Sequence, residues 1–227
     1  MGGDRPYFGE LLMHCFFTTH HDGNMGLHVG DNPLYVHQNR ERLREKTPWQ
    51  NLVFMEQVHG DEIVVVDATT KTPRCDAMIS NTKGIGLCVM VADCIPLLFY
   101  DAPTQSIGVA HAGRAGSALH VSSKTVRAMQ EHFGAKPESI NVYMGPSIKA
   151  CCYEVGLDAC DGLEHVTHQR GERFFLDLRE ANRQELLNIG ILEHHIVDTA
   201  VCTCCENGYF SYRKQKVTGR FVGVIGL

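Results

Sequence analysis

The sequence predicts an α+β fold in which helices cover mixed β-sheets. The chain has 227 residues, of which 44% are hydrophobic and 21% are charged, enough to bury one substantial core and typical of a soluble globular protein. Apolar runs of strand length recur along it, some in direct succession and others alternating with amphipathic helices. This mixture favours a sandwich of mixed sheets over a strictly parallel, doubly wound sheet. We expect a single domain spanning residues 1–227.

Short apolar segments predict the strands. Residues 63–70 (IVVVDATT) form a β-branched run typical of a buried strand. Two further runs are interrupted around Cys94 and Pro96, and Pro96 favours a strand start or a bulge because it has no backbone N–H to donate. The remaining predicted strands are residues 84–93, 95–101, 105–111, 140–146, 194–201 and 219–227.

Two segments, residues 117–133 and 177–190, predict amphipathic helices. Ser117 and Asp177 are plausible N-caps, and a glycine stands at the end of each helix. We expect one face of the first helix to be apolar, formed by Leu119, Val126, Met129 and Phe133.

The net charge and the cysteine content indicate which kind of partner and which cellular compartment to expect. The net charge of −5 argues against nucleic acid as the main partner. The opening stretch is apolar only briefly and carries Glu10 and His14, so it resembles neither a secretory signal nor a membrane span. We therefore expect a cytoplasmic protein that binds no membrane and whose ten cysteines are reduced.

Two cysteine pairs are weak metal candidates. Cys202 and Cys205 form a CxxC pair, but a structural zinc requires two more ligands. The adjacent Cys151 and Cys152 are the only other cluster, and neighbouring cysteines seldom bind one ion together. We do not expect the two pairs to form a zinc site.

Three other side chains beside strand-like segments are stronger candidates: His59, Cys94 and His111. Two histidines and one cysteine form a known catalytic zinc set with an open fourth position. Their separations of 35 and 17 residues are not a local metal signature. A zinc site, a Cys94–His111 nucleophile pair and a core cysteine with incidental histidines therefore all remain open on spacing alone.

Two segments suggest anion binding. Gly145 and Ser147 lie in a tight turn after a predicted strand, where exposed backbone amides can hold an anion, although a plain turn is the simpler interpretation. Basic residues gather near Arg213, where a solvated face is the default and a phosphate or carboxylate clamp is the alternative.

Taken together, the motifs resemble the YfiH/laccase-domain family, whose members are described as zinc-dependent purine nucleoside phosphorylases. The resemblance runs from about Phe17 to Leu227, and the joint pattern is highly specific although each motif alone is weak. In chain order the motifs are QVHG, DAMIS, VADCIPLLFYD, AHAGRAG, GPSIKACCYEVG, DLREANRQELLNIGI, CT and FSYRK…TGR.

The resemblance implies an α/β/β/α sandwich with one zinc ion, held by His59, Cys94 and His111, with copper as a possible substitute. It further implies phosphorolysis of adenosine, inosine, guanosine and methylthioadenosine, and deamination of adenosine. The expected partners are thus a purine nucleoside and phosphate. Cys94 is then better interpreted as a zinc thiolate than as an attacking sulfur.

Further roles follow as hypotheses from that implied chemistry. Asp76 or Asp93 would handle protons, and Arg114 or Arg213 would hold phosphate; Asp93 would alternatively fix a ligand or the turn. We place Asn24, Gly145, Ser147 and Arg213 on the substrate side.

The chain departs from the family pattern at two places, both on the expected substrate side. His20 replaces an arginine, and only Asn24 and Gly26 remain of a glycine-rich loop. The family's HAGWRG is HAGRAG here, which moves the arginine one place earlier, to Arg114.

Three other functions compete with the leading one. They are a copper-dependent polyphenol oxidase, a Cys94-dependent hydrolase that edits peptidoglycan precursors, and a non-catalytic zinc-dependent binding protein.

Overall fold

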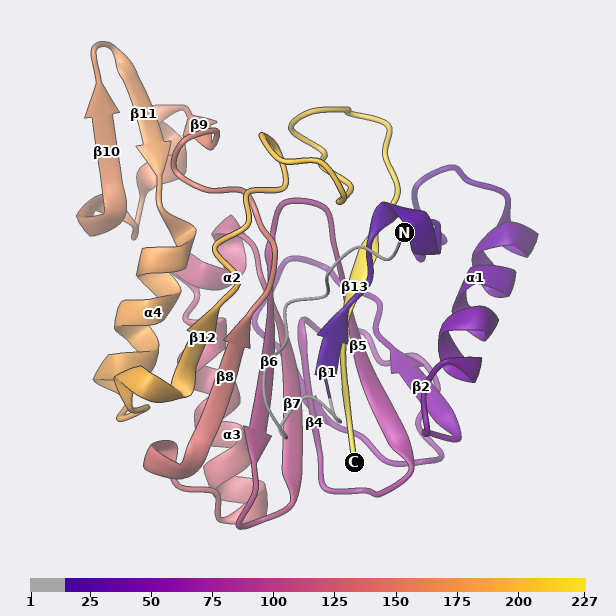
Figure 1. Cartoon of the computed structure of the whole chain (residues 1–227). Coiled ribbons are helices and arrows are strands. Elements are labelled where there is room, and N and C mark those ends of the chain that lie inside the picture. The colour runs from indigo at the N-terminus through magenta and orange to yellow at the C-terminus, as the bar shows by residue number, and fades with distance from the viewer. Residues whose placement is uncertain (1–14) are drawn as a thin grey trace.

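The computed structural model describes residues 15–227 and contains two packed β-sheets (Figure 1). The opening stretch up to His14, on which the expectation about a secretory signal depends, lies outside the described residues. The larger sheet has the order β12-β8-β6-β7-β4-β3. Its strands are β12 (Ile196–Asp198), β8 (Ile140–Met144), β6 (Ile95–Asp101), β7 (Ser106–Ala112), β4 (Ala77–Ser80) and β3 (Ile63–Val65).

The smaller sheet has the order β1-β13-β5-β2 and packs face to face against the larger one. Both sheets are mixed: β2 pairs parallel with β5, and β13 pairs antiparallel with β5. The apolar cluster between the sheets includes Leu87 of β5 and Leu98 of β6, both fully buried. The strands of the smaller sheet are β1 (Cys15–Phe17), β13 (Phe221–Gly226), β5 (Ile85–Val91) and β2 (Asn51–Phe54).

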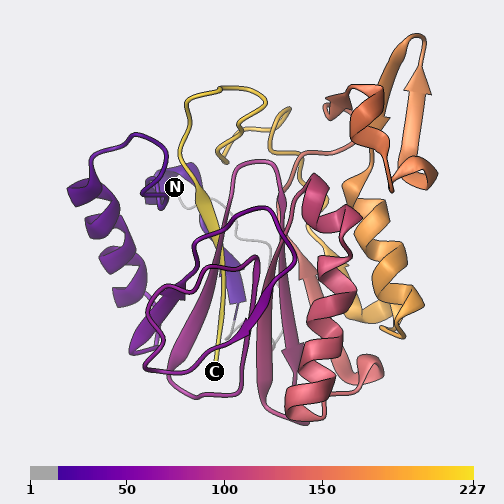
Figure 2. The same ribbon diagram turned by 180° about the vertical axis from the view of Figure 1, so that it is seen from behind.

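Helices cover the outer face of each sheet, which confirms the predicted α/β/β/α sandwich. Helix α1 (Pro33–Glu45) packs on the smaller sheet through Leu43, beside Trp49. Helices α2 (Arg114–Ala118), α3 (Val121–Phe133) and α4 (Leu178–Asn188) lie on the other side of the molecule, against the larger sheet (Figures 1 and 2). A small sheet, β10-β11-β9, projects beyond α4: β9 (Glu154–Val155), β10 (Thr167–Arg170) and β11 (Arg173–Leu176).

The helix expected over residues 117–133 is in fact two helices, which corrects the prediction. His120 adopts a left-handed conformation (φ 65°) between α2 and α3, and a break at one such residue ends a right-handed helix. Ser117 therefore lies inside α2 rather than capping a helix; it is buried and accepts a hydrogen bond from Asn182. Leu119, expected on the apolar face, lies at the break and is exposed.

The second helix forms as predicted. Asp177 caps α4 by accepting a hydrogen bond from the Glu180 amide, and Gly190 follows the helix with a positive φ of 104°. Pro96 is the second residue of β6, as its missing N–H predicted. No helix in residues 15–227 is long and apolar enough to span a bilayer.

Strand direction brings the candidate residues to one end of the sandwich. Strands β6 and β7 are antiparallel, so the beginning of β6, next to Cys94, adjoins the end of β7, which contains His111. Strand β5 belongs to the smaller sheet, so the short connection from Val91 to Ile95 passes between the sheets. Cys94 thus lies where the chain changes sheet.

Candidate metal centre

The structure brings His59, Cys94 and His111 together from three distant segments. One ligand atom from each lies within 4.8 Å of the others. The two imidazole rings are 4.7 Å apart, edge to face. His111 is buried, Cys94 is half-buried and His59 is exposed, so the group opens to solvent on the His59 side.

A buried carboxylate orients one of the histidines. The Nδ1 atom of His111 is 2.8 Å from Oδ1 of Asp76, whose side chain is fully buried. A carboxylate only accepts hydrogen bonds, so the proton is on Nδ1 and Nε2 is left as the ligand atom. This carboxylate–histidine arrangement is the usual support of a metal-bound imidazole.

The same carboxylate fixes the loop that carries the second histidine. Asp76 accepts hydrogen bonds from the backbone amides of Val58, His59 and Gly60, at 3.1, 3.0 and 2.7 Å. Burial alone would raise the pKa of Asp76, but the hydrogen bonds from His111 and these amides outweigh burial and lower it. Asp76 is therefore charged and sets the positions of two candidate ligands at once.

Two further features hold this loop in place. Before His59, the side-chain amide of Gln57 both donates to and accepts from the backbone of Met90 in β5, at 2.8 and 2.9 Å. In the described part of the chain five non-glycine residues have positive φ, and His59 and Asp93 are two of them. Such conformations concentrate at functional sites, where the surrounding structure enforces them.

Cys94 and His111 form a charged pair in the metal-free protein. Burial alone would raise the pKa of Cys94, but the charge and hydrogen bond of His111, with those of His59, lower it to about 6. Burial alone would lower the pKa of His111, but Cys94 and Asp76 raise it to about 9. Between these values the thiolate is present and His111 is protonated, so a metal ion must displace a proton from His111.

Metal affinity is therefore expected to depend on pH. As the pH falls from 9 to 7, we expect the affinity of the metal-free chain for Zn²⁺ to fall about tenfold per unit, because one proton on His111 competes with the ion. Competition against a chromophoric chelator at each pH measures the zinc affinity. Calorimetry in buffers of different ionisation enthalpy counts the protons released when zinc binds. An affinity that is constant across this range would contradict the assignment.

Asp93 is committed to protein groups beside the site. Its carboxylate accepts a hydrogen bond from the Thr203 hydroxyl at 2.7 Å and from the Arg213 amide at 2.6 Å. Its backbone carbonyl accepts from the amide of Ile148. These contacts connect the turn before Cys94 to three distant loops.

Three arginines and a tyrosine lie near enough to the group to interact with its charges or with those of Asp93. Burial and the charges of Cys94 and Asp93 raise the pKa of Tyr153, against the opposing charges of Arg114 and Arg213. Arg213 donates to the carbonyl of Glu154, and its guanidinium carbon is 5.5 Å from the centre of the Tyr153 ring. Arg220 also lies within electrostatic range of Cys94 and Asp93. The surroundings of the thiolate are therefore basic enough to attract an anion.

Asn24 organises this region through the protein itself. Its side chain donates to the Gly26 carbonyl and to Asp31, and accepts from the amides of Gly26 and Arg220. A Cβ atom on Gly26 would lie 2.9 Å from Arg220 Cγ, so glycine is needed there. The remaining Asn-x-Gly motif thus positions Arg220, and a substrate contact by Asn24 stays a prediction.

The turn at Gly145 and Ser147 is buried and is used by the protein. The amides of Gly145, Ser147 and Ile148 donate to the carbonyls of Pro96, Val201 and Asp93. The Ser147 hydroxyl accepts from the buried Arg179. These three amides already donate within the protein and are not available to bind an anion, which favours the plain-turn interpretation.

Gly145 is expected to tolerate no side chain. A Cβ atom there would lie 2.3 Å from Phe17 Cε1 and 2.6 Å from Pro96 Cγ, so Gly145→Ala should lower the free energy of unfolding by about 1–3 kcal/mol through overpacking. Urea denaturation measures the change. An unchanged midpoint and slope would show that the turn accommodates the methyl group without cost.

The family match decides the classification. Residues 16–227 match the model of the family described as multi-copper polyphenol oxidoreductase laccase. The chain belongs to this family. Among curated members, it is 34% identical to purine nucleoside phosphorylase YlmD of Geobacillus stearothermophilus, over 99% of this chain and 92% of that one. It is 35% identical to purine nucleoside phosphorylase YfiH of Escherichia coli K12, over 90% and 86% of the two chains.

Two solved structures with at least 30% sequence identity share the fold. The crystal structure of a Bacillus licheniformis hypothetical protein, YfiH, superposes with a TM-score of 0.88 at 30% identity, covering 94% of this chain and 92% of that one. The structure of YlmD from G. stearothermophilus superposes with a TM-score of 0.86 at 34% identity, covering 93% and 90%. The mixed α/β sandwich predicted from the sequence is therefore confirmed.

The donor set fits one metal ion. Two imidazoles and a thiolate are suitable ligands for zinc and for copper, and Asp76 already directs Nε2 of His111 away from the carboxylate. Sequence analysis did not assign Tyr153, Arg179 or Arg220 to the site. All three lie inside the quoted motifs, which was the available signal, although Arg179 looked like an ordinary residue of an amphipathic helix.

Proposed function

We propose that this chain is a zinc-dependent purine nucleoside phosphorylase that also deaminates adenosine, acting on adenosine, inosine, guanosine and methylthioadenosine. The observation that carries the proposal is the group of His59, Cys94 and His111, supported by Asp76 and open on one side. The names of the curated relatives support the phosphorylase activity. The single exposed ligand, His59, marks the side from which the substrate enters.

A zinc ion bound by two imidazoles and one thiolate supplies a Lewis acid with an open position. The chain's own residues supply the rest. Phosphorolysis forms a bond between a phosphate oxygen and C1′ of the ribose and breaks the bond from C1′ to the purine nitrogen. The electron pair of that broken bond leaves with the purine, so negative charge builds on the departing base, and the attacking phosphate is itself an anion that must be held near C1′. Arg114 and Arg213 hold the phosphate, and Arg220 adds to the positive field around it.

Two carboxylates have different parts in this proposal. Asp76 keeps His111 in one tautomer and remains charged. Asp93 is assigned to fixing the turn before Cys94, because Thr203 and Arg213 both donate to it. We assign Tyr153 to contact with the nucleoside, because the charges of Cys94, Arg114 and Arg213 all act on its hydroxyl.

One experiment tests the activity directly. Purified protein is incubated with inosine or adenosine, with and without phosphate, and free base, ribose 1-phosphate and ammonia are quantified. Phosphate-dependent release of hypoxanthine from inosine is the expected result. Ammonia from adenosine without phosphate reports deamination separately. If neither base nor ammonia is released from any of the four nucleosides by zinc-loaded protein, the proposal fails.

The alternatives appear as distinct outcomes of parallel assays. Stoichiometric copper together with oxygen-dependent phenol oxidation identifies a polyphenol oxidase. Cleavage of an amide in a peptidoglycan precursor, with no need for metal, identifies a Cys94 hydrolase. Nucleoside binding without turnover identifies a binding protein.

A further inference from the structure

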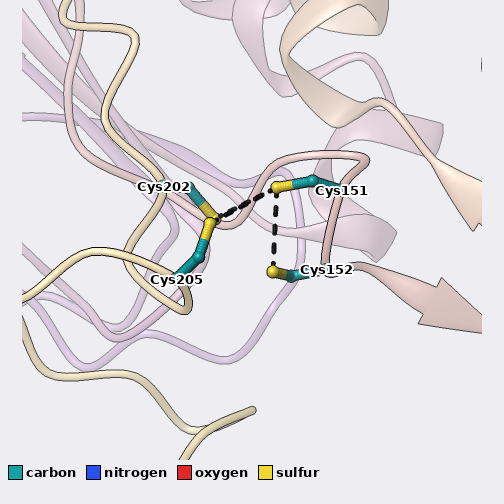
Figure 3. Close-up of side chains that lie close together, drawn as sticks. All are labelled: Cys151, Cys152, Cys202 and Cys205. Carbon is teal, nitrogen blue, oxygen red and sulfur yellow. Dashed lines mark hydrogen bonds between the residues drawn. The ribbon is translucent and has the colours of Figure 1, made fainter.

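A second group of four cysteines lies outside the metal centre. Cys151 and Cys152 follow β8, and Cys202 and Cys205 follow β12 (Figure 3). Their four sulfur atoms lie within 4.8 Å of one another. The two pairs, which we did not expect to form a zinc site, lie together because β8 and β12 are parallel neighbours and deliver both loops to the same edge.

The three sulfur–sulfur separations from Cys151 match those of a tetrahedral metal site. Cys151 Sγ lies 3.7 Å from Cys152 Sγ, 3.6 Å from Cys202 Sγ and 3.5 Å from Cys205 Sγ. Four thiolates at about 2.3 Å from a zinc ion are about 3.8 Å apart. A disulfide requires about 2.05 Å, and all four cysteines are free thiols.

The backbone around the four sulfurs is well fixed. Ser147 and Cys202 form a β-bridge, in which the Ser147 amide donates to Val201 and the Thr203 amide donates to Ser147. The buried guanidinium of Arg179 donates to the carbonyls of Gly145 and Val201 and so ties the two loops together. The ligand atoms are thus placed by backbone that the rest of the fold already holds.

Polar groups also compensate the charge of a thiolate set. The backbone amides of Lys149, Cys204 and Cys205 lie close enough to the Cys202 sulfur to favour its thiolate. Arg179 lies within electrostatic range of the same sulfur. Amide and cationic partners of this kind are what surrounds a metal-bound thiolate.

We propose that Cys151, Cys152, Cys202 and Cys205 bind a second, structural metal ion of the thiolate-preferring class, with zinc as the ion expected. Four protein ligands close the coordination sphere, so this ion has no open position for a substrate. Cys151 and Cys205 are exposed and Cys202 is buried. The ion therefore joins the two loops at the surface of the protein.

The four-cysteine group is also connected to the metal centre, through Asp93. Thr203, between two of the ligands' positions in the chain, donates to Asp93, and Ile148 of the other loop donates to the Asp93 carbonyl. Asp93 immediately precedes Cys94. The second ion thus stabilises the two loops that hold the turn before Cys94.

Metal counting in the full chain tests the proposal. We expect two zinc ions per chain in protein purified with a thiol-free reductant, one ion in Cys205→Ser and in Cys151→Ser, and one ion in His59→Ala. The two serine variants alter exposed positions, so folding should be retained and circular dichroism verifies it. Cys204→Ser, on the same loop but outside the group, should keep both ions.

Cobalt substitution gives a readout that is independent of catalysis. Cobalt at a tetrathiolate site produces intense sulfur-to-metal charge transfer and red-shifted ligand-field bands, and the Cys205→Ser variant should lose them whereas His59→Ala keeps them. Hydrogen exchange should also rise in residues 147–152 and 199–206 of Cys205→Ser. One ion per chain that is unaffected by Cys205→Ser, loss of an ion in Cys204→Ser, or two disulfides in place of the ion would each overturn the proposal.

Discussion

Replacing Asp76 by asparagine should lower the free energy of unfolding of the metal-free protein by about 3 kcal/mol, because a buried charged group would lose part of its network. The carboxylate accepts three backbone amides and faces Nδ1 of His111. An asparagine keeps one oxygen but turns an NH₂ group towards other donors. Zinc affinity should fall roughly 10- to 100-fold, because His111 loses its orienting partner and the His59 loop is released.

The measurement is urea denaturation of chelator-treated protein, followed by zinc competition on the folded variant. Asp67→Asn is the matched control, since Asp67 also accepts amide hydrogen bonds, from Thr69 and Thr70, but is exposed. We expect a far smaller change in stability for that variant and unaltered zinc affinity. Equal effects of the two substitutions would show that the burial of Asp76 does not explain the losses of stability and zinc affinity.

Replacing His59 by alanine should remove the ion of the metal centre and, with it, the proposed activity. Loss of an outer partner alone lowers metal affinity or activity roughly 10- to 100-fold, so loss of one of three ligands should lower kcat/KM by more than about 100-fold. This variant also separates the two interpretations of Cys94. A Cys94–His111 nucleophile pair does not require His59, because the Cys94 thiolate is stabilised first by His111.

Zinc content and turnover are measured on the same preparation. His37→Ala, an exposed histidine of α1 on the outer side of the smaller sheet, is the control and should change neither. Retained turnover in metal-free His59→Ala protein would assign Cys94 as a nucleophile. Retained zinc with lost turnover would instead place His59 on the substrate.

Local sequence patterns predicted most of the fold. Short apolar and β-branched runs located β5, β6, β7, β8, β12 and β13, and the capping residue Asp177 located the start of α4. The buried strand expected over residues 63–70 is shorter, since β3 covers only Ile63–Val65, and its side chains are half-buried or exposed. The break at His120 was not predicted, because the helical periodicity of residues 117–133 continues through it. Packing of α2 against α4, where Asn182 donates to Ser117, is a tertiary interaction without a local signal.

The candidate site was likewise predicted in part from the sequence and in part visible only in the tertiary structure. Residue type and position next to strands singled out His59, Cys94 and His111 from the sequence, and the family resemblance selected a metal centre among the three interpretations. The sequence did not reveal that Asp76 supports two ligands, since its partners lie 16–18 and 35 residues away. Hydrogen-bond networks of this kind depend on which strand ends meet.

The sequence by itself determined the class of fold, several of its strands, helix α4 and the identity of the candidate ligands, because these depend on periodicity, capping and side-chain chemistry within short segments. Only the tertiary structure decided which cysteines are neighbours. Cys151 and Cys202 are 51 residues apart and lie side by side because β8 pairs parallel with β12. Pairing between distant strands is fixed by burial of both sheet faces in a shared core, which no short segment encodes.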